Sequence, residues 1–298
     1  MIERKQNPES SRGLPFDVEF PLKAALEGGG EIMKIYRAST FNVQLKGDDT
    51  PVTFADTQSH AAIFRILSQT GFPVLSEEGK AIDYLERKSW ESFWLVDPLD
   101  GTKEFIKRNG QFAINIAFID NGVPLWGMIF IPVTGEVYLG SPRSGLYEIH
   151  LPEGWEYIPV EKLIANYPVT PNIQPLEERR FVVVTSRSHD NALTSEIVNY
   201  AMQLFFGVDN VQVGSAIKQA MVASGKAHFY PRLGKTMEWD TAAGHALVRS
   251  VGGDIIDIDT YLPLKYNKPN LQNPDFYCHR GDLFSRKLLD LLRGRIRG

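Results

Sequence analysis

Two helices, each with one apolar face, are predicted near the start of the chain. The first begins after Pro21, where apolar residues recur at helical spacing at Leu22, Ala25, Leu26, Met33 and Tyr36. Three consecutive glycines at residues 28–30 weaken its middle, because glycine is a poor helix former. The second helix follows Asp56, has its apolar stripe at Ile63, Ile66 and Leu67, and stops at Gly71. We expect these two helices to pack together.

Strands dominate the pattern from residue 93 to residue 139. Residues 93–96 form a short apolar run that ends at Asp97-Pro98, which is typical of a buried strand that delivers its last residue into a loop. Apolar positions then alternate from Phe112, residues 120–122 (Asp-Asn-Gly) give a turn signal, and an apolar stretch covers residues 123–131. A further strand runs through Val137 and Leu139. The first half is therefore predicted to be α+β with consecutive antiparallel strands.

The second half alternates strands and helices. Residues 151–180 are rich in proline and charge, which indicates a crossing between two lobes. Beyond it the pattern predicts strands at 181–184 and 227–230, helices at 190–205 and 216–223, and a helix that Asp240 caps and Gly252-Gly253 ends. We divide the chain into a polar tail at 1–16, an α+β lobe at 17–160 and an α/β lobe at 161–298.

The composition is that of an ordinary globular protein. The 298 residues are 43% apolar and 23% charged, and the formal net charge of -4 argues against a basic surface for a nucleic acid polymer. Cys278 is the only cysteine, which excludes an intrachain disulfide and a thiolate-rich metal site. No apolar run approaches the roughly 20 residues that cross a bilayer, and the first residues are not signal-like. These features predict a cytoplasmic protein without a transmembrane segment; attachment to the inner face of the membrane stays open.

Acidic residues mark the candidate chemistry. Asp97 and Asp100 flank a bend that Pro98 stiffens and Gly101 permits, so their carboxylates can converge. Mg²⁺ prefers oxygen ligands and usually takes one or two carboxylates per ion. Two further acidic positions are Glu77-Glu78, at a predicted strand end, and Asp240, at a predicted helix start. Each also has a structural explanation, since a carboxylate at a helix N-terminus is a common cap.

The order of these motifs resembles one enzyme family. Glu77-Glu78, then Asp97-Pro98-Leu99-Asp100-Gly101-Thr102, then Trp239-Asp240-Thr241-Ala242-Ala243-Gly244 resemble the inositol monophosphatase superfamily of lithium-sensitive phosphatases. Residues 97–106 (DPLDGTKEFI) are most similar to its 3'(2'),5'-bisphosphate nucleotidase (CysQ-type) branch. The similarity runs from about residue 24 to the end of the chain. It implies a layered αβαβα sandwich of the inositol monophosphatase / fructose-1,6-bisphosphatase type.

The resemblance also assigns a metal site. It implies two or three Mg²⁺ ions, inhibition by Li⁺, and five metal ligands, with Leu99 acting through its backbone carbonyl: Glu77, Asp97, Leu99, Asp100 and Asp240. By the same resemblance, Asp56 matches an acidic position that holds a further ion through water and pairs with Thr102. Our mechanistic hypothesis gives catalytic roles to Asp56, Thr102 and Glu77: Asp56 and the Thr102 hydroxyl orient and deprotonate the attacking water, and Glu77 positions an additional ion near it. The alternative for Asp56 is a plain helix cap.

A substrate subsite follows from the same resemblance. The backbone N–H groups of Gly101 and Thr102 are expected to face the phosphate, and His189 to lie near an adenine. Ser215, Lys218 and Arg232 are expected to hold a second phosphate, because a bisphosphate needs a cationic contact away from the metals. The alternatives are a helix cap for His189 and solvated surface charges for Lys218 and Arg232.

These features predict a Mg²⁺-dependent phosphomonoesterase with a small phosphorylated nucleotide as substrate. The predicted reaction converts adenosine 3',5'-bisphosphate to AMP and phosphate, with its sulfonated relative PAPS as a candidate second substrate. An inositol monophosphatase is the nearest alternative, and a non-catalytic nucleotide-binding sensor is the alternative of another class. Both a monomer and a homodimer are compatible with the sequence.

Overall fold

The computed structural model describes residues 13–38, 43–45, 51–166, 170–171, 180–187 and 192–293. His189 and most of the predicted polar tail lie outside these ranges, so the role predicted for His189 is not part of the structural account.

The first half of the chain builds a mixed sheet of seven strands. Their order is β3 (Val74–Ser76), β4 (Ser92–Asp100), β5 (Ala113–Asp120), β6 (Val123–Ile131), β7 (Glu136–Ser141), β8 (Gly145–His150) and β9 (Thr170–Pro171). Strand β3 runs parallel to β4, and every following pair is antiparallel. The predicted antiparallel meander is confirmed, and its first turn uses Asn121 and Gly122, both at positive φ.

The second half builds a mixed sheet of five strands. Their order is β11 (Val208–Val213), β10 (Phe181–Ser186), β12 (Phe229–Arg232), β14 (Phe276–His279) and β13 (Asp254–Asp257). Strand β10 is parallel to both of its neighbours, and β14 is antiparallel to both of its own. The sequence pattern did not predict β11, whose side chains are half-buried or exposed, or the short strands β13 and β14.

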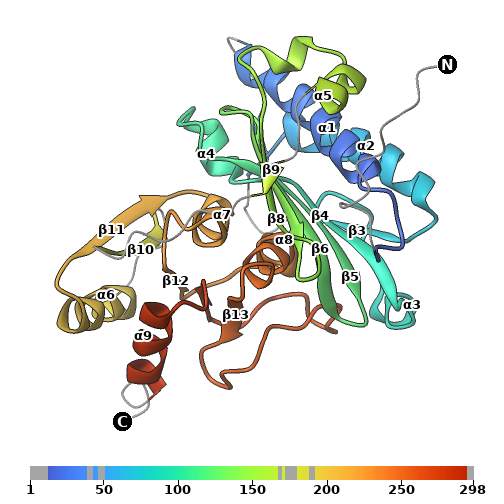
Figure 1. Cartoon of the computed structure of the whole chain (residues 1–298). Coiled ribbons are helices and arrows are strands. Elements are labelled where there is room, and N and C mark those ends of the chain that lie inside the picture. The colour runs from blue at the N-terminus through green and yellow to red at the C-terminus, as the bar shows by residue number, and fades with distance from the viewer. Residues whose placement is uncertain are drawn as a thin grey trace.

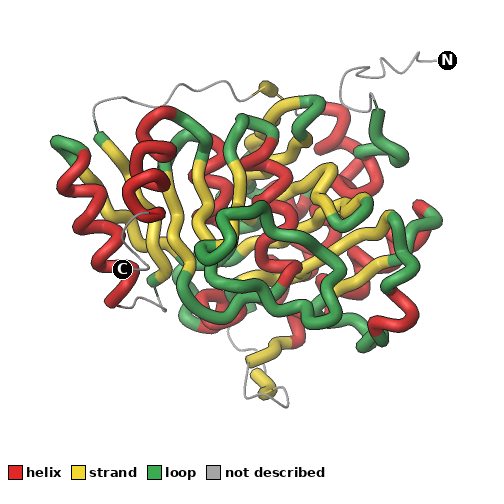
Figure 2. The backbone as a smooth tube through the Cα atoms, turned by 90° about the horizontal axis from the view of Figure 1, so that it is seen from below, coloured by secondary structure: helices red, strands yellow, loops and turns green. Residues whose placement is uncertain are grey.

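Helices separate and cover the two sheets. Helices α1 (Glu19–Arg37) and α2 (Phe54–Leu67) pack on one face of the seven-stranded sheet, and α7 (Ile217–Ser224) and α8 (Glu238–Arg249) lie between the two sheets. Helices α6 (Ala192–Leu204) and α9 (Leu283–Arg293) cover the outer face of the five-stranded sheet (Figures 1 and 2). The predicted layered αβαβα sandwich is therefore confirmed.

Short elements complete the chain. They are β1 (Val43–Leu45), β2 (Pro51–Thr53), α3 (Tyr84–Arg87), α4 (Thr102–Ile106), α5 (Val160–Asn166) and 3-10 turns at Ser68–Thr70 and Trp155–Tyr157. Helix α5 packs on α1 and β9 pairs with β8, so the chain stays with the first sheet as far as Pro171. The division of the chain at residue 160 stays a prediction. No helix within the described ranges combines the length and apolar character needed to cross a membrane.

The three consecutive glycines in α1 allow this helix to pack closely against its neighbours. Helix α1 continues unbroken through residues 28–30. A Cβ atom on Gly28 would lie 2.8 Å from a side-chain carbon of Ile63 on α2, and one on Gly29 would lie 2.4 Å from the ring of Phe130 on β6. The glycines therefore allow close contact of α1 with α2 and with the sheet, which outweighs their low helix propensity.

Candidate active site

The acidic residues meet at the end of strand β4. The pairing of β4 with β5 shifts between Asp97 and Asp100, so Pro98 and Leu99 form an irregularity between the two aspartates. The backbone amide of Leu99 donates to Asp97 Oδ1 at 3.0 Å. Gly101, at φ +92°, then turns the chain into α4. A strand with this irregularity presents both carboxylates near the same end of β4.

Glu77 and Asp240 reach the same place from other elements. Glu77 follows β3, and its amide donates to the Val96 carbonyl at 3.1 Å, beside Asp97. Asp240 stands in the first turn of α8, the helix between the two sheets. One carboxylate oxygen from each of Glu77, Asp97 and Asp240 lies within 4.8 Å of the others. Three segments far apart in the sequence therefore present oxygen atoms to one point.

The cluster carries more negative charge than a buried site tolerates by itself. Burial raises the pKa of Asp97 well above its usual range, and the charges of Glu77, Asp100 and Asp240 raise it further. Burial and the neighbouring Asp100 and Glu77 likewise raise the pKa of Asp240. Crowded carboxylate oxygens are the donor set of a hard divalent cation, which would remove this repulsion. The residues present therefore fit Mg²⁺.

Asp100 links the cluster to the second half of the chain. Its Oδ2 atom accepts from the backbone amide of Ala216, next to α7, and from the side-chain amide of Asn115 at 3.4 Å. Burial raises the pKa of Asp100, while the positive charge of Lys218 and the bond from Ala216 lower it. The Oδ2 atom of Asp100 is thus hydrogen-bonded within the protein.

Asp56 and Thr102 form a hydrogen-bonded pair at the edge of the cluster. The Thr102 hydroxyl donates to Asp56 Oδ1 at 2.9 Å and lies 3.3 Å from the Leu99 carbonyl. Asp56 also accepts from the backbone amide of Thr53 in a capping box at the start of α2. The helix cap and the pairing with Thr102 were predicted as alternatives, but both occur together in the structure. Burial raises the pKa of Asp56, and the bonds from Thr53 and Thr102 oppose this.

A cavity of about 260 Å³ opens over these groups. Its wall includes the acidic cluster and its neighbours, Glu77, Asp97, Leu99, Asp100, Gly101, Thr102 and Asp240, and on another side Ser215, Lys218 and Arg232. Every predicted site residue within the described ranges lines it, except Asp56, which reaches it through Thr102.

Lys218 and Arg232, the two cations predicted to hold a second phosphate, are buried, so the alternative that they are solvated surface charges is wrong. Lys218 is 4% exposed and Arg232 is 8% exposed. The Lys218 ammonium donates to the carbonyls of Val213 (3.0 Å) and Ser215 (2.7 Å) and lies 5.3 Å from the ring centre of Tyr230. Burial lowers the pKa of Lys218 to about 8. Arg232 donates to the Lys235 carbonyl at 3.0 Å, and its Nε atom has no hydrogen-bond partner among the described residues.

Other residues of the wall were not predicted. Gln219 on α7 donates its side-chain amide to the backbone carbonyl of Asp240 at 2.7 Å, which joins α7 to the first turn of α8. Lys103, Glu104, Tyr230, Lys235 and Thr236 also face the cavity. The sequence signal for Gln219 is its place beside Lys218 in a segment, residues 217–224, that is otherwise mostly apolar.

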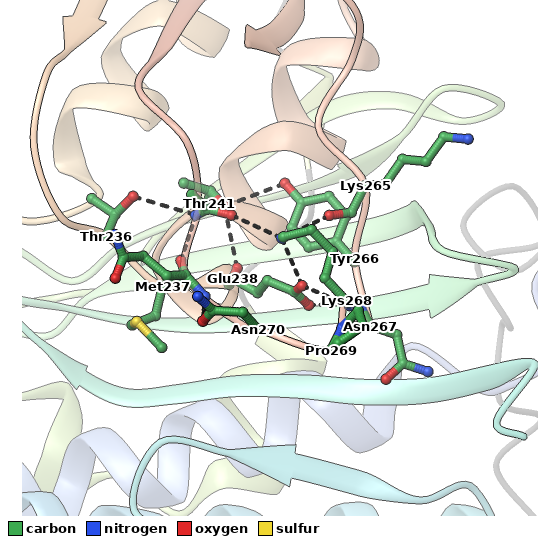
Figure 3. Close-up of polar contacts among 12 residues, drawn as sticks. Thr236, Met237, Glu238, Thr241, Lys265, Tyr266, Asn267, Lys268, Pro269 and Asn270 are labelled. Carbon is green, nitrogen blue, oxygen red and sulfur yellow. Dashed lines mark hydrogen bonds and ion pairs between the residues drawn. The ribbon is translucent and has the colours of Figure 1, made fainter. Parts of the chain in front are cut away.

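The start of α8 is held by a buried polar network (Figure 3). The Glu238 carboxylate accepts from the backbone amides of Asn267 (2.6 Å) and Lys268 (2.9 Å) and from the Lys268 ammonium (2.7 Å). Asn273 donates its side-chain amide to the Met237 carbonyl at 2.7 Å and to the Thr241 hydroxyl at 3.0 Å. The segment that precedes Asp240 is therefore clamped by the connection between β13 and β14.

A second group of ligand-type side chains lies elsewhere, on β7 and β8. It consists of Glu136, Glu148 and His150. Glu136 there already pairs with the Lys226 ammonium at 3.1 Å and accepts from the Tyr138 hydroxyl at 3.0 Å. The Lys226 ammonium thus already supplies a positive charge to this group, in the place where a metal ion would otherwise do so.

Comparisons with known proteins agree with this geometry. The model of the inositol monophosphatase family matches residues 17–283. The 3'(2'),5'-bisphosphate nucleotidase CysQ of Shigella flexneri is 40% identical over 257 residues, which are 85% of this chain and 95% of that protein. The crystal structure of CysQ from Bacteroides thetaiotaomicron has a TM-score of 0.76 and 40% identity, and covers 88% of this chain and 96% of its own.

A more distant structure shares the fold alone. The Thermotoga maritima IMPase TM1415 has a TM-score of 0.68 at 19% identity, over 93% of this chain and 96% of that one. The family model spans nearly the whole described chain, and the CysQ proteins are 40% identical over most of their length. This chain belongs to the inositol monophosphatase family.

Proposed function

We propose that the protein is a Mg²⁺-dependent 3'(2'),5'-bisphosphate nucleotidase that hydrolyses the 3'-phosphate of adenosine 3',5'-bisphosphate to give AMP and phosphate. PAPS is proposed as a second substrate. The observation that carries the proposal is a single cavity that has an acidic cluster in one wall and two buried cations in another. Such a cavity suits a small molecule with two separate anionic groups.

The acidic wall is the proposed metal site. Two or three Mg²⁺ ions are held by the carboxylates of Glu77, Asp97, Asp100 and Asp240 and by the Leu99 carbonyl. Bound Mg²⁺ supplies positive charge for the phosphoryl oxygens and makes a water molecule acidic enough to attack phosphorus near neutral pH. The close approach of the Glu77, Asp97 and Asp240 oxygens supports this assignment.

Thr102 and Asp56 are the proposed proton acceptors. The Thr102 hydroxyl directs its own proton to Asp56 Oδ1, so its oxygen lone pairs stay available to a water molecule in the cavity. As the water attacks phosphorus, Thr102 takes its proton and passes its own to Asp56. The bond between phosphorus and the ribose 3'-oxygen breaks, and this oxygen leaves with AMP and takes up a proton from solvent water. Glu77 would hold an additional ion near this water, and the backbone amides of Gly101 and Thr102 are proposed to face the phosphate.

Lys218, Arg232 and Ser215 are the proposed subsite for the second phosphate. Arg232 has a buried Nε–H that lacks a partner among the described residues, and an anion in the cavity would accept from it. Burial keeps both cations poorly hydrated, which strengthens their attraction for a phosphate. An inositol monophosphate has no second phosphate to use these charges, so the bisphosphate is favoured over that alternative. The 40% identity to CysQ proteins, against 19% to the Thermotoga IMPase, supports the same choice.

A substrate panel tests the proposal. Phosphate release is measured with adenosine 3',5'-bisphosphate, inositol 1-phosphate and fructose 1,6-bisphosphate, each with Mg²⁺, with EDTA, and with Mg²⁺ plus Li⁺. We expect the highest kcat/KM for the adenosine compound, no release in EDTA, and inhibition by Li⁺. Preference for inositol 1-phosphate would transfer the proposal to the inositol monophosphatase alternative. Tight binding of the nucleotide without release of phosphate would identify a sensor.

A further inference from the structure

A third residue stands behind the Asp56–Thr102 pair. Thr53 is the last residue of β2 and the N-cap of α2, and it is 2% exposed. Its hydroxyl donates to Asp56 Oδ2 at 2.6 Å and its backbone amide donates to the same oxygen at 2.7 Å. Thr102 approaches the other oxygen, Oδ1. The carboxylate of Asp56 is therefore held from both sides, with one oxygen for each threonine.

The direction of these bonds is fixed by the donors available. The Thr53 oxygen already accepts from the backbone amide of Ala55 at 3.1 Å, so its own proton is free to go to Asp56. A capping box needs only the bond from the N-cap amide to the carboxylate and the bond from the helix amide to the hydroxyl. The additional bond from the Thr53 hydroxyl to Asp56 exceeds what helix capping requires.

We propose that Thr53 is a positioning residue that fixes the Asp56 carboxylate, so that Oδ1 alone faces Thr102. The torsion that turns an aspartate carboxylate is intrinsically loose, so the side chain does not fix its own orientation. Thr53 supplies two donors to Oδ2, which leaves Oδ1 as the oxygen that receives the proton from Thr102. Asp56 in turn accepts from Thr102, the first residue of α4, so the orientation that Thr53 gives to the carboxylate also governs the geometry of the Asp56–Thr102 bond.

This inference rests on the proposed role of Asp56 and Thr102 in activating water. It predicts an effect on turnover rather than on substrate binding, because Thr53 contacts neither the cations nor the second wall of the cavity and does not line it. Loss of the hydroxyl frees Oδ2 from its shortest bond, so the carboxylate spends less time in the productive orientation.

The test compares five variants with the intact protein. Phosphate release from adenosine 3',5'-bisphosphate is measured at saturating Mg²⁺ for T53V, which is isosteric but lacks the hydroxyl, and for T53S, which retains it. We expect T53V to lower kcat about 10- to 100-fold, within the range of general acid–base catalysis, with KM changed less than about twofold. T53S should recover most of the loss. T53G repeats the test with a residue that is itself an acceptable N-cap, in case T53V does not fold.

Thr57 provides the matched control. It lies in the first turn of the same helix, is exposed, and donates its hydroxyl to the Phe54 carbonyl at 3.0 Å, away from Asp56. T57V should retain the kcat of the intact protein. A folded T53V or T53G with unchanged kcat, or a T53S as slow as T53V, overturns the inference.

The variant D56N separates this inference from the proposed function. If D56N is inactive while T53V is fully active, the water-activating pair stands and the role of Thr53 is wrong. If D56N itself turns over at the normal rate, the pair is wrong and the inference falls with it.

Discussion

The hydroxyl of Ser59, on helix α2, donates to the carbonyl of Pro98, in the bend of strand β4, at 2.8 Å. Ser59 is fully buried, so this bond ties the first helical layer to the backbone between the two aspartates of the metal site. The position of Asp97 and Asp100 thus depends on a side chain that takes no part in the cavity wall.

Replacement of Ser59 by alanine should therefore affect both stability and activity. The Pro98 carbonyl would lose its partner in a buried place, which typically costs about 1–3 kcal/mol. We expect a lower free energy of unfolding in urea and a weaker response of activity to Mg²⁺, since the bend that presents the ligands is less firmly held. An S59A protein with an unchanged urea midpoint and an unchanged Mg²⁺ titration would show that the bond is dispensable.

The glycine run of α1 gives a matched pair of substitutions. A Cβ atom on Gly29 would collide with Phe130, whereas one on Gly30 meets nothing within 4 Å. G29A should be destabilising by about 1–3 kcal/mol, the usual cost of overpacking. G30A should stabilise the protein by roughly 0.4–1 kcal/mol through helix propensity and reduced freedom of the unfolded chain. Urea unfolding of the two variants measures both effects, and equal shifts in the same direction would contradict the packing account.

Asp97→Asn should abolish phosphate release and leave the protein folded. In the absence of cations, the neutral amide relieves the repulsion that burial and the neighbouring carboxylates impose on Asp97. We therefore expect D97N, measured in EDTA, to unfold at the same or a higher urea concentration than the intact protein. The stabilisation that added Mg²⁺ gives to the intact protein should be small or lost in D97N. Turnover at the normal rate in D97N would falsify the metal assignment.

Lys218 predicts a pH dependence of substrate capture. Its pKa in the folded protein is about 8, below the ordinary 10.5, because burial disfavours the charged form. The ammonium that attracts the second phosphate is thus lost as the pH rises through about 8, so kcat/KM for adenosine 3',5'-bisphosphate should fall above that pH. Replacement of Lys218 by methionine should lower kcat/KM at neutral pH and remove this step from the profile.

The same group has the opposite effect on stability. Between pH 8 and pH 10.5 the unfolded chain carries the proton on Lys218 more often than the folded chain does. The contribution of this group to the free energy of unfolding therefore rises with pH across that interval. This contribution is measured as the difference in free energy of unfolding between the intact protein and K218M, determined at pH 7.5 and at pH 10. The same difference at both pH values would contradict the prediction.

Local patterns were enough to predict the parts of the fold that are periodic. The hairpin of β5 and β6, with Asn121-Gly122 in its turn, and the helix that begins near Asp240 were both anticipated from spacing and turn residues. Strand β11 was missed because it lies at a sheet edge, where a half-exposed strand lacks a continuous apolar run. The sequence did not predict whether Lys218 is buried. Its burial depends on how the two sheets stack, which the local spacing of residues does not encode.

The candidate site was predictable only as a set of motifs. That the motifs containing Glu77, Asp97 and Asp240 belong together came from the resemblance to a family, because their sequence separation says nothing about their distance in space. The contacts that hold them, such as Gln219 with the Asp240 carbonyl, were not anticipated. Supporting residues of this kind lie inside apolar segments. The sequence shows that the residue is polar, but it does not show which group will be its hydrogen-bond partner.

The position of α8 between the two sheets has a consequence for how the protein acquires its chemistry. Three of the four acidic ligands precede residue 101, yet the fourth, Asp240, arrives on a helix that cannot dock until both sheets exist to enclose it. A chain that stops before this helix retains β4, with Asp97 and Asp100, but lacks Asp240 and therefore the complete set of acidic residues proposed to bind Mg²⁺. The proposed Mg²⁺ site would therefore be complete only in a chain whose α8 is seated between the two sheets.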